Sequence, residues 1–403
     1  MPLALPFREP VSLYVHVPFC LSKCPYCDFN TYQGMEHAMV PYVEAAAEEA
    51  SLWGERLGNP PAATVFFGGG TPSYIKAEQL EQLLSSLTAA FPLEDQAEVT
   101  AEANPGDLDE SKLHAMLAMG IGRLSIGVQS LDDGLLRMLG RRHTAADAVA
   151  SYRRARRLGF RNVSLDLMYG LPHQSMEQWE ASVQGILDLG PEHLSLYGLT
   201  LEPGTAMEQQ VRMGALPEPD PDLAAGMYEH AREALGGAGY QHYEISNWCL
   251  PDYSSQHNLA YWRMQPYLGI GPGAHSNLGR LRFNNVKLPS HYTRCVRQWS
   301  EMAQPIPACL DEMVLAGTPP VETFEVTSDE TAMAETMFLG LRLLEGVTLK
   351  EFQERHGTGL MEVYGGEIEE LAGNGLLEYD SECVKLTAKG LLLSNQVFLR
   401  FIR

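Results

Sequence analysis

The sequence predicts an α/β protein, in which a partial, TIM-like (β/α)6 barrel over residues 1–246 precedes a smaller, winged-helix-like α+β domain over 310–403. The first reason is that short β-branched runs alternate with longer helical stretches between residues 11 and 246, which is typical of a parallel sheet with helical crossovers. The second is that these runs end in glycine or polar residues. Functional groups of barrels collect at the carboxyl ends of the strands, so a partial barrel is favoured over a doubly wound sheet.

The predicted barrel consists of six strands with helices between them. The strands are SLYVHV, TVFFGGG, EVTAEAN, RLSIGVQ, VSLDLMYG and HLSLYGLTLEPG, and the helical stretches include 35–58, 76–91, 144–158 and 175–189. A Pro-rich bridge at 216–222 leads into a further helix. The segment 247–309 is rich in Gly, Pro and Asn, which are turn residues, and we expect it to be irregular and to cover the barrel mouth.

The carboxyl-terminal pattern predicts a winged helix. A helix capped by Ser328 is followed by helices in VTLKEFQERHG and LMEVYGGEIEELAGNGLL, a hairpin in LEYDSECVKLTAKG and a last helix. Winged helices often bind DNA, but residues 328–403 hold 7 Lys and Arg against 13 Asp and Glu. The helix that would enter the DNA groove carries Glu362, Glu367, Glu369 and Glu370. We therefore expect a module that packs on the barrel or covers it, without phosphate contacts.

The charge balance of the whole chain argues against nucleic acid as a partner. With 29 Lys and Arg against 51 Asp and Glu in 403 residues, the net charge is −22, which repels nucleic acid and anionic membrane surfaces. A hydrophobic content of 45% is enough to fill a core. The sequence shows no signal-peptide pattern and no apolar stretch of about 18 residues, so we expect a cytoplasmic protein that is not integral to a membrane.

Seven cysteines divide into a cluster and a scattered set. Cys249, Cys295, Cys309 and Cys383 are far apart in sequence, and we expect buried free thiols in a reducing compartment. Cys20, Cys24 and Cys27 lie together in VPFCLSKCPYCDF, directly after a predicted strand.

The clustered cysteines predict a metal centre. Sites rich in thiolates select zinc or iron–sulfur clusters, and a cluster normally takes four protein ligands. A C-x3-C-x2-C triad therefore predicts a 4Fe-4S cluster in which one iron is open to another ligand. The alternative is a zinc site completed by His16 or Cys249, although structural zinc sites usually pair their ligands in two spaced groups.

Further candidates for binding lie beside the triad and at the strand ends. Tyr26 places an aromatic ring next to a cluster or nucleoside, and Tyr14 is either a hydrogen-bonding group near the open iron or an aromatic residue that lines the barrel. Gly69, Gly70 and Thr71 belong to a glycine turn that lets the backbone approach a ligand closely, or that only tightens the turn.

Polar residues at three more strand ends complete the predicted site. Glu102 offers a carboxylate to an ammonium or a ribose hydroxyl, the alternative being a turn-stabilising role. Gln129, Asp166 and Arg141 are expected to bind a second polar ligand, with Arg141 taking a carboxylate, or to form a salt-bridged structural set.

The motifs together resemble one family across nearly the whole chain. In order, YVHVPFCLSKCPYCDF, FFGGGTP, EANP, GVQS, GRRHT and DLMYGLP resemble the coproporphyrinogen III dehydrogenase (HemN-like) group of radical S-adenosylmethionine (SAM) proteins. The resemblance implies that the three cysteines ligate a 4Fe-4S cluster and that a SAM molecule chelates its open iron. It also implies that Tyr14, Gly69 and Glu102 contact this SAM, and that the positions around a second SAM are Gly70, Thr71, Gln129, Arg141 and Asp166.

Two departures from the dehydrogenase pattern put that activity in doubt. The dehydrogenase typically has a fourth cysteine soon after the triad, where this chain has Asp28-Phe29-Asn30, and a long amino-terminal extension, where only nineteen residues precede Cys20. The sequence also resembles the heme chaperone branch of the group at His257-Asn258-Leu259-Ala260-Tyr261, an H-N-x-x-Y motif.

This second resemblance implies that the protein binds heme and passes it to acceptors such as membrane respiratory proteins. His257 and Tyr261 would then lie on one helical face as candidate heme ligands, with His275 as another. The alternative is that His257 and Tyr261 only belong to the hydrogen-bond network of a loop. The competing activity is radical oxidative decarboxylation of coproporphyrinogen III.

Overall fold

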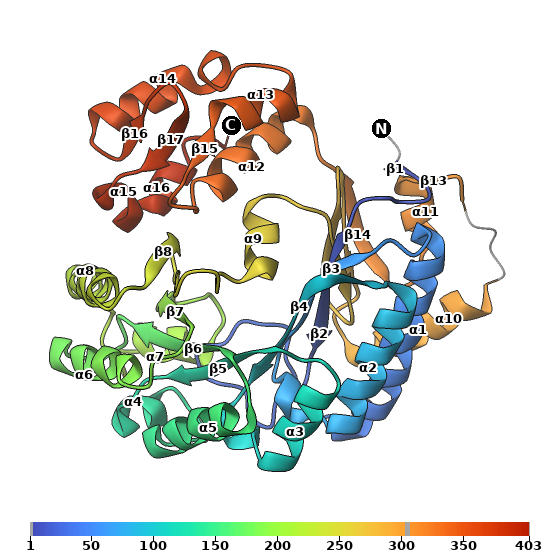
Figure 1. Ribbon diagram of the computed structural model, residues 1–403, viewed down its shortest axis with the longest axis horizontal. Coiled ribbons are helices and arrows are strands. Elements are labelled where there is room, and N and C mark those ends of the chain that lie inside the picture. The colour runs from blue at the N-terminus through green and yellow to red at the C-terminus, as the bar shows by residue number, and fades with distance from the viewer. Residues whose placement is uncertain (1–2, 303–306, 403) are drawn as a thin grey trace.

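The computed structural model describes residues 3–302 and 307–402, and Figure 1 shows its arrangement. Residues 1–2, 303–306 and 403, which fall within the predicted domains, lie outside the described residues. Among the described helices, none is both long enough and apolar enough to cross a bilayer.

Six parallel strands in chain order form the centre of the fold, which confirms the predicted α/β partial barrel. They are β2 (Val11–Val17), β3 (Ala62–Gly69), β4 (Leu93–Ala103), β5 (Arg123–Gln129), β6 (Asn162–Tyr169) and β7 (His193–Gly198). The barrel is not closed within the described part of the chain, because β2 pairs on its outer side with β10 and β7 pairs with β9. The sheet therefore curves around an interior that stays open.

Helices cover the outer face of this curved sheet (Figure 1). The larger ones are α1 (Met39–Leu57), α2 (Ala77–Ala90), α3 (Glu110–Ala118), α5 (Ala145–Leu158), α6 (Met176–Leu187) and α8 (Pro221–Gly237). Shorter helices in the connections are η1 (Glu36–Ala38), η2 (Pro72–Tyr74), η3 (Pro105–Asp107), α4 (Asp133–Met138) and α7 (Ala206–Arg212), of which α7 packs against the cysteine loop. The predicted helix 144–158 begins at a capping box between Thr144 and Asp147 and ends at Gly159, which is in the left-handed region with φ +119°. Such an N-terminal cap contributes about 1 kcal/mol to the stability of the protein.

The two faces of the sheet have opposite character. In β2, Val11, Leu13, Val15 and Val17 are fully buried in the core beneath the helices, and each such side chain contributes about 1.5–3 kcal/mol. Tyr14 points to the other face and lines a cavity. The alternation places polar residues of five strands on the interior face: Glu102, Ser125, Asp166, Ser195 and Tyr14. The packed interior of a closed TIM barrel is thus replaced by a polar cavity.

The segment 247–309 is largely regular, so the expectation that it is irregular was wrong. It contains β9 (Asn247–Cys249), α9 (Gln256–Trp262), β10 (Tyr267–Ile270), β11 (His275–Leu278), β12 (Leu281–Asn285), α10 (Pro289–Glu301) and the start of β13 (Cys309–Leu310). Strands β10, β11 and β12 extend the sheet beyond β2, and β8 (Gln241–Glu244) and β9 extend it beyond β7. Only α9 lies on the inner side, between the sheet and the C-terminal module (Figure 1).

The C-terminal module has the predicted winged-helix order. Its elements are α12 (Asp329–Gly340), β15 (Val347–Thr348), α13 (Leu349–His356), α14 (Leu360–Gly373), β16 (Leu377–Tyr379), β17 (Cys383–Leu386), α15 (Ala388–Leu392) and α16 (Ser394–Phe398). The Ser328 hydroxyl caps α12 by accepting from the Thr331 amide at 3.0 Å. Residues before this helix pack elsewhere: β14 (Val321–Val326) pairs with β12, α11 (Glu312–Ala316) contacts β14, and β13 pairs with β1 (Leu3–Ala4). The module therefore starts near Ser328 instead of at 310.

Candidate functional site

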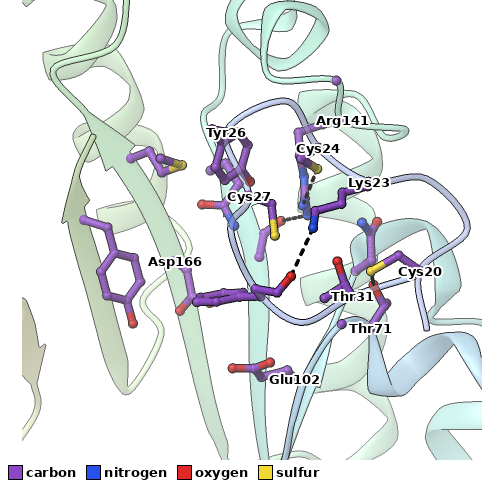
Figure 2. Close-up of a pocket in the computed structure, with 18 of the residues that line it drawn as sticks. Cys20, Lys23, Cys24, Tyr26, Cys27, Thr31, Thr71, Glu102, Arg141 and Asp166 are labelled. Atoms are coloured by element: carbon purple, nitrogen blue, oxygen red, sulfur yellow. Dashed lines mark hydrogen bonds between the residues drawn. The ribbon is translucent and has the colours of Figure 1, made fainter. Parts of the chain in front are cut away.

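A cavity of about 370 Å³ opens at the carboxyl ends of the parallel strands. The structure brings most of the predicted binding residues together around it (Figure 2). They are Cys20, Cys24, Tyr26, Cys27, Gly69, Gly70, Thr71, Glu102, Gln129, Arg141 and Asp166. Tyr14, His257 and Tyr261 line a second cavity of about 210 Å³ on the inner side of the same sheet, which shares Glu102 and Asp166 with the first, and His275 lines neither.

The cysteine loop forms one wall of the larger cavity. Backbone hydrogen bonds hold its shape: Cys27 N donates to Cys24 O at 3.1 Å, and Cys20 N donates to Tyr32 O at 3.0 Å. The Sγ of Cys20 lies 3.4 Å from the Thr71 hydroxyl. Burial raises the pKa values of Cys20 and Cys27, so both thiols favour the neutral form unless a cation is bound. An iron–sulfur cluster supplies the positive charge that would stabilise the thiolates.

The donor set fits a cluster better than a single ion. Within residues 3–302 and 307–402, no three Cys, His, Asp or Glu side chains are gathered closely enough to hold one metal ion. A four-iron cluster distributes its thiolates over different irons. The ligands offered for the zinc alternative are also poorly placed: both ring nitrogens of His16 are hydrogen-bonded, and Cys249 is on β9, at the far side of the sheet.

The other scattered cysteines are free thiols as well. Cys249 and Cys295 are buried, whereas Cys309 and Cys383 are half-buried. The expected burial of this set therefore holds for two of its four members, and none of the seven cysteines forms a disulfide.

The glycine turn after β3 packs directly against the cysteine loop. Gly69 has φ +107°, and a Cβ on Gly70 would lie 2.7 Å from the carbonyl oxygen of Phe19. Gly70 N donates to Val17 O at 2.8 Å, and Thr71 N donates to Phe19 O at 2.9 Å. The absence of side chains thus permits a close approach between two backbone segments of the chain. This turn fixes the loop that carries the cysteines.

Two half-buried carboxylates face the cavity across from the cysteines (Figure 2). Burial, reinforced by Asp166, raises the pKa of Glu102 to about 7, and Glu102 accepts one hydrogen bond, from Gly69 N at 3.1 Å. Burial also raises the pKa of Asp166, which accepts from the hydroxyls of Ser125 (3.1 Å) and Ser164 (3.2 Å). A ligand that brings an ammonium or hydroxyl groups would compensate both groups.

Arg141 provides the positive charge of the site. Its Nη2 donates to Gly127 O at 2.7 Å and its Nη1 lies 3.8 Å from the Sγ of Cys24, while its buried Nε has no partner. Burial alone would lower the pKa of Arg141, but Tyr26 and Cys24 raise it, so the guanidinium stays charged. No ion pair between Arg141 and Asp166 is present among the described residues, which favours the ligand-binding interpretation over a salt-bridged set.

Gln129 and Tyr26 line the cavity close to this arginine. Gln129 adopts φ +68° at the end of β5, an unusual conformation that turns its amide toward Gly127 and Arg141. Burial raises the pKa of the Tyr26 hydroxyl, so it remains protonated beside the guanidinium.

His257 and Tyr261 lie on α9, at the inner end of the barrel. His257 is only 1% exposed, and both of its ring nitrogens have partners: Thr64 Oγ1 at 2.7 Å from Nδ1 and the Tyr261 hydroxyl at 2.9 Å from Nε2. Its ring stacks on Phe66 with centroids 5.0 Å apart. Burial lowers the pKa of His257 to about 3, so the imidazole is neutral. In this arrangement the motif is part of a satisfied hydrogen-bond network.

Tyr14 lies beside this network. Its hydroxyl is 3.0 Å from His16 Nδ1, and its ring stacks loosely on Phe66 at 6.3 Å. Burial raises the pKa of Tyr14 well above its ordinary value. Tyr14 therefore lines the interior, as one of its two predicted roles requires, and its role near the open iron stays a prediction.

Sequence reasoning missed the charged pair that anchors α9. Glu98 on β4 accepts from the amides of Gln256 (3.3 Å) and His257 (3.2 Å), at the positive end of the helix, and lies 3.8 Å from Arg123 on β5. The Arg123 side chain is 3% exposed and faces the smaller cavity. The sequence offered one signal for this pair. The strand-like runs EVTAEAN and RLSIGVQ each begin with a charged residue, Glu98 and Arg123.

Comparison with known proteins places the chain in a family. The family model of the Radical SAM superfamily matches residues 14–185, and that of the HemN C-terminal domain matches 327–393. The chain is 38% identical to "Heme chaperone HemW" of Bacillus subtilis, over 97% of this chain and 99% of that protein. It is 36% identical to the protein of the same name from Lactococcus lactis, over 98% of both chains.

Two further likenesses agree with this placement. The mouse "Radical S-adenosyl methionine domain-containing protein 1, mitochondrial" is 38% identical over 97% of this chain and 87% of that one. The structure of Escherichia coli HemN superposes with a TM-score of 0.83, covering 99% of this chain and 91% of that chain at 23% identity, which shows the shared fold. The radical SAM segment contains all three clustered cysteines, and the similarity to the chaperones spans nearly the full length, so the chain belongs to the HemW family of radical SAM proteins.

Proposed function

We propose that this protein is a heme chaperone, which binds heme, carries a SAM-liganded 4Fe-4S cluster and delivers heme to acceptor proteins. The observation that carries the proposal is full-length identity of 36–38% to proteins named as heme chaperones. The segment Asp28-Phe29-Asn30 supports it, because it has no cysteine where the HemN-like dehydrogenases typically have their fourth, and Phe29 exposes a phenyl ring at the mouth instead.

In this proposal Cys20, Cys24 and Cys27 hold three irons of the cluster. The cluster, when bound, supplies a low-potential electron and one open iron for the amino and carboxylate groups of SAM. The chain itself positions the ligand and excludes water from it. Glu102 accepts hydrogen bonds from the ammonium side of the ligand, because its carboxylate accepts only one hydrogen bond within the chain, from Gly69 N. Tyr14 and Gly69 complete this contact.

A second polar ligand is proposed for the opposite wall. Gly70, Thr71, Gln129, Arg141 and Asp166 line the same cavity. The unpartnered Nε of Arg141 matches a carboxylate, and Asp166, held by two serine hydroxyls, matches a ligand hydroxyl. A second SAM molecule carries both groups.

The proposed acceptors are respiratory heme proteins, and the proposed location is the cytoplasm. Seven free cysteines support a reducing compartment. The acidic helix α14 and the net charge of −22 support the view that nucleic acid is not a partner.

Anaerobic reconstitution with iron and sulfide, followed by titration with heme and incubation with an apo-cytochrome, tests this function. We expect stoichiometric heme binding, detected by its Soret band, and transfer of the heme to the acceptor. A reconstituted protein that retains no heme would refute the proposal.

A further inference from the structure

A third hollow, here called the His275 groove, lies between the cysteine loop and strands β10 and β11, and it meets the cluster cavity at Gly69 and Glu102. It measures about 770 Å³, within the range of about 300–1,000 Å³ that is usual for pockets of drug-sized ligands. Its floor is the inner face of β2, β10 and β11, where Gly269 of β10 pairs with Tyr14 of β2. One wall is residues 28–32 of the cysteine loop, and the other is Tyr261 of α9.

The groove is lined by aromatic rings. Tyr14, Tyr32, Tyr261 and Tyr267 contribute to it, and Phe29 stands at its lip with 63% of its surface exposed. An exposed phenyl ring is costly in water and gains free energy when an apolar ligand covers it. Aromatic side chains also favour flat, conjugated ligands, because offset stacking adds to the burial of apolar area. These features fit a planar macrocycle.

Three histidines lie near the groove, and they differ in whether a nitrogen is available. Both nitrogens of His257 are bonded, to Thr64 and Tyr261, and both nitrogens of His16 are bonded, to Tyr14 (3.0 Å) and to the Asn30 carbonyl (2.9 Å). His275 is exposed, and in the described residues its ring makes no hydrogen bond. Burial and Lys287 lower the pKa of His275, so the ring is neutral at pH 7, which is the form that binds iron.

Two lysines give the groove a positive rim in a strongly acidic protein. Lys23 and Lys287 both line it, and Lys23 Nζ donates to the Phe29 carbonyl at 3.1 Å. No carboxylate of the described residues forms an ion pair with either ammonium, although Asp28 and Glu102 also line the groove. The net charge of the chain is −22, so a free pair of cations at one site indicates a ligand with carboxylates.

The cysteine loop is tied firmly to the segment of residues 272–287, which carries Lys287. The Asn30 side-chain amide donates to Pro272 O and to Lys287 O, each at 3.0 Å, and the Tyr32 hydroxyl donates to Lys287 O at 3.2 Å. A Cβ on Gly273 would lie 2.6 Å from the Asn30 side chain. The wall of residues 28–32 is thus held in a fixed position against the segment from Pro272 to Lys287, as binding of a rigid ligand requires.

We propose that the His275 groove is where this protein holds heme, with His275 as the axial iron ligand and Lys23 and Lys287 pairing with the two heme carboxylates. The inference rests on the proposed function. It assigns His257 and Tyr261 a positioning role: Tyr261 forms a wall of the groove, and His257 fixes the Tyr261 hydroxyl.

Heme titration of the reconstituted full chain and three variants tests the inference. His275→Ala should weaken heme binding at least about tenfold and change the Soret position and the electron paramagnetic resonance signature of the ligated iron. Lys287→Glu should weaken binding severalfold without altering the axial-ligand spectrum. His291→Ala, in which an exposed histidine of α10 is removed, is the matched control and should bind as the wild type does.

The possible failures can be told apart. If the wild type binds no heme, the proposed function fails and the groove assignment fails with it. If the wild type binds heme and His275→Ala has the same affinity and spectrum, only the assignment to His275 is overturned. Iron content and circular dichroism check that His275→Ala is folded, and His275→Gln, which keeps the size of the side chain, should show the same spectral change.

Discussion

The barrel mouth and helix α9 carry similar polar residues but differ in how completely these are paired. On α9, both nitrogens of His257 and the first amides of the helix have partners supplied by Thr64, Tyr261 and Glu98. At the mouth, Arg141 keeps an unpartnered buried Nε, and Glu102 is a half-buried carboxylate with a single hydrogen bond. Unsatisfied buried groups are costly, so the mouth is arranged for a ligand, whereas α9 is arranged to be stable without one.

The largest effect is expected from the cysteine loop. Cys20→Ser, Cys24→Ser or Cys27→Ser each removes one of three thiolates on one loop, and each should abolish the cluster, because serine does not replace a soft sulfur ligand of iron. Iron and acid-labile sulfide analysis after anaerobic reconstitution measures this loss. Cys383→Ser, in the C-terminal module, is the control and should retain a full cluster. Full iron content in a triad variant would contradict the assignment.

The second prediction concerns α9. His257→Ala should lower the stability of the protein by about 3 kcal/mol, because it removes a buried ring and leaves Thr64 and Tyr261 without partners. The readout is the thermal unfolding midpoint of the protein without ligands, compared with His291→Ala, which should unfold as the wild type does. Unfolding of His257→Ala at the wild-type temperature would contradict the conclusion that the hydrogen bonds of His257 stabilise the fold.

The third prediction concerns Glu102. Glu102→Gln should weaken SAM binding about tenfold or more, since a hydrogen bond to a charged group contributes about 1.5–3 kcal/mol and about 1.4 kcal/mol is a tenfold change. Equilibrium dialysis of the reconstituted protein with labelled SAM measures the affinity. Unlike His257→Ala, this variant should not lower the unfolding midpoint. Wild-type SAM affinity in Glu102→Gln would remove the carboxylate from the proposed contact.

The parts of the fold that followed from the sequence are those with local signals. The predicted helices 144–158 and 175–189 correspond to Ala145–Leu158 and Met176–Leu187, because Thr144 and Ser175 cap them and Gly159 ends the first. The winged-helix order also followed from helical period and turn residues. Strands β10 to β12 did not, because each has four or five residues between Gly, Pro and Asn, and β10 pairs with β2, which lies far from it in sequence.

The residues of the candidate site likewise divide into those that the sequence predicted and those whose state it could not predict. The cysteine spacing and the polar strand ends predicted residues that the structure gathers around one cavity, since parallel strands bring their carboxyl ends to one edge. Whether His257 is exposed or buried and hydrogen-bonded could not be predicted. An i, i+4 pair on a helix is compatible with an exposed ligand pair and with a buried one, and only the position of Thr64 on β3 decides between them.

The smallest expected effect is a pH dependence that comes from the mouth. Because the pKa of Glu102 is raised to about 7 from 4.5, the folded protein without ligands binds a proton that the unfolded chain has released. Stability should therefore fall as the pH rises from about 4.5 to about 7 and level off above that, with a loss of about 1 kcal/mol between about pH 6 and pH 8. Thermal unfolding across this range should show a smaller loss of stability in Glu102→Gln, whose side chain does not ionise. Bound SAM should reverse the trend in wild type, because its ammonium stabilises the ionised carboxylate. If the two proteins lose stability equally with pH, the polar groups of the mouth are as completely hydrogen-bonded as those of α9.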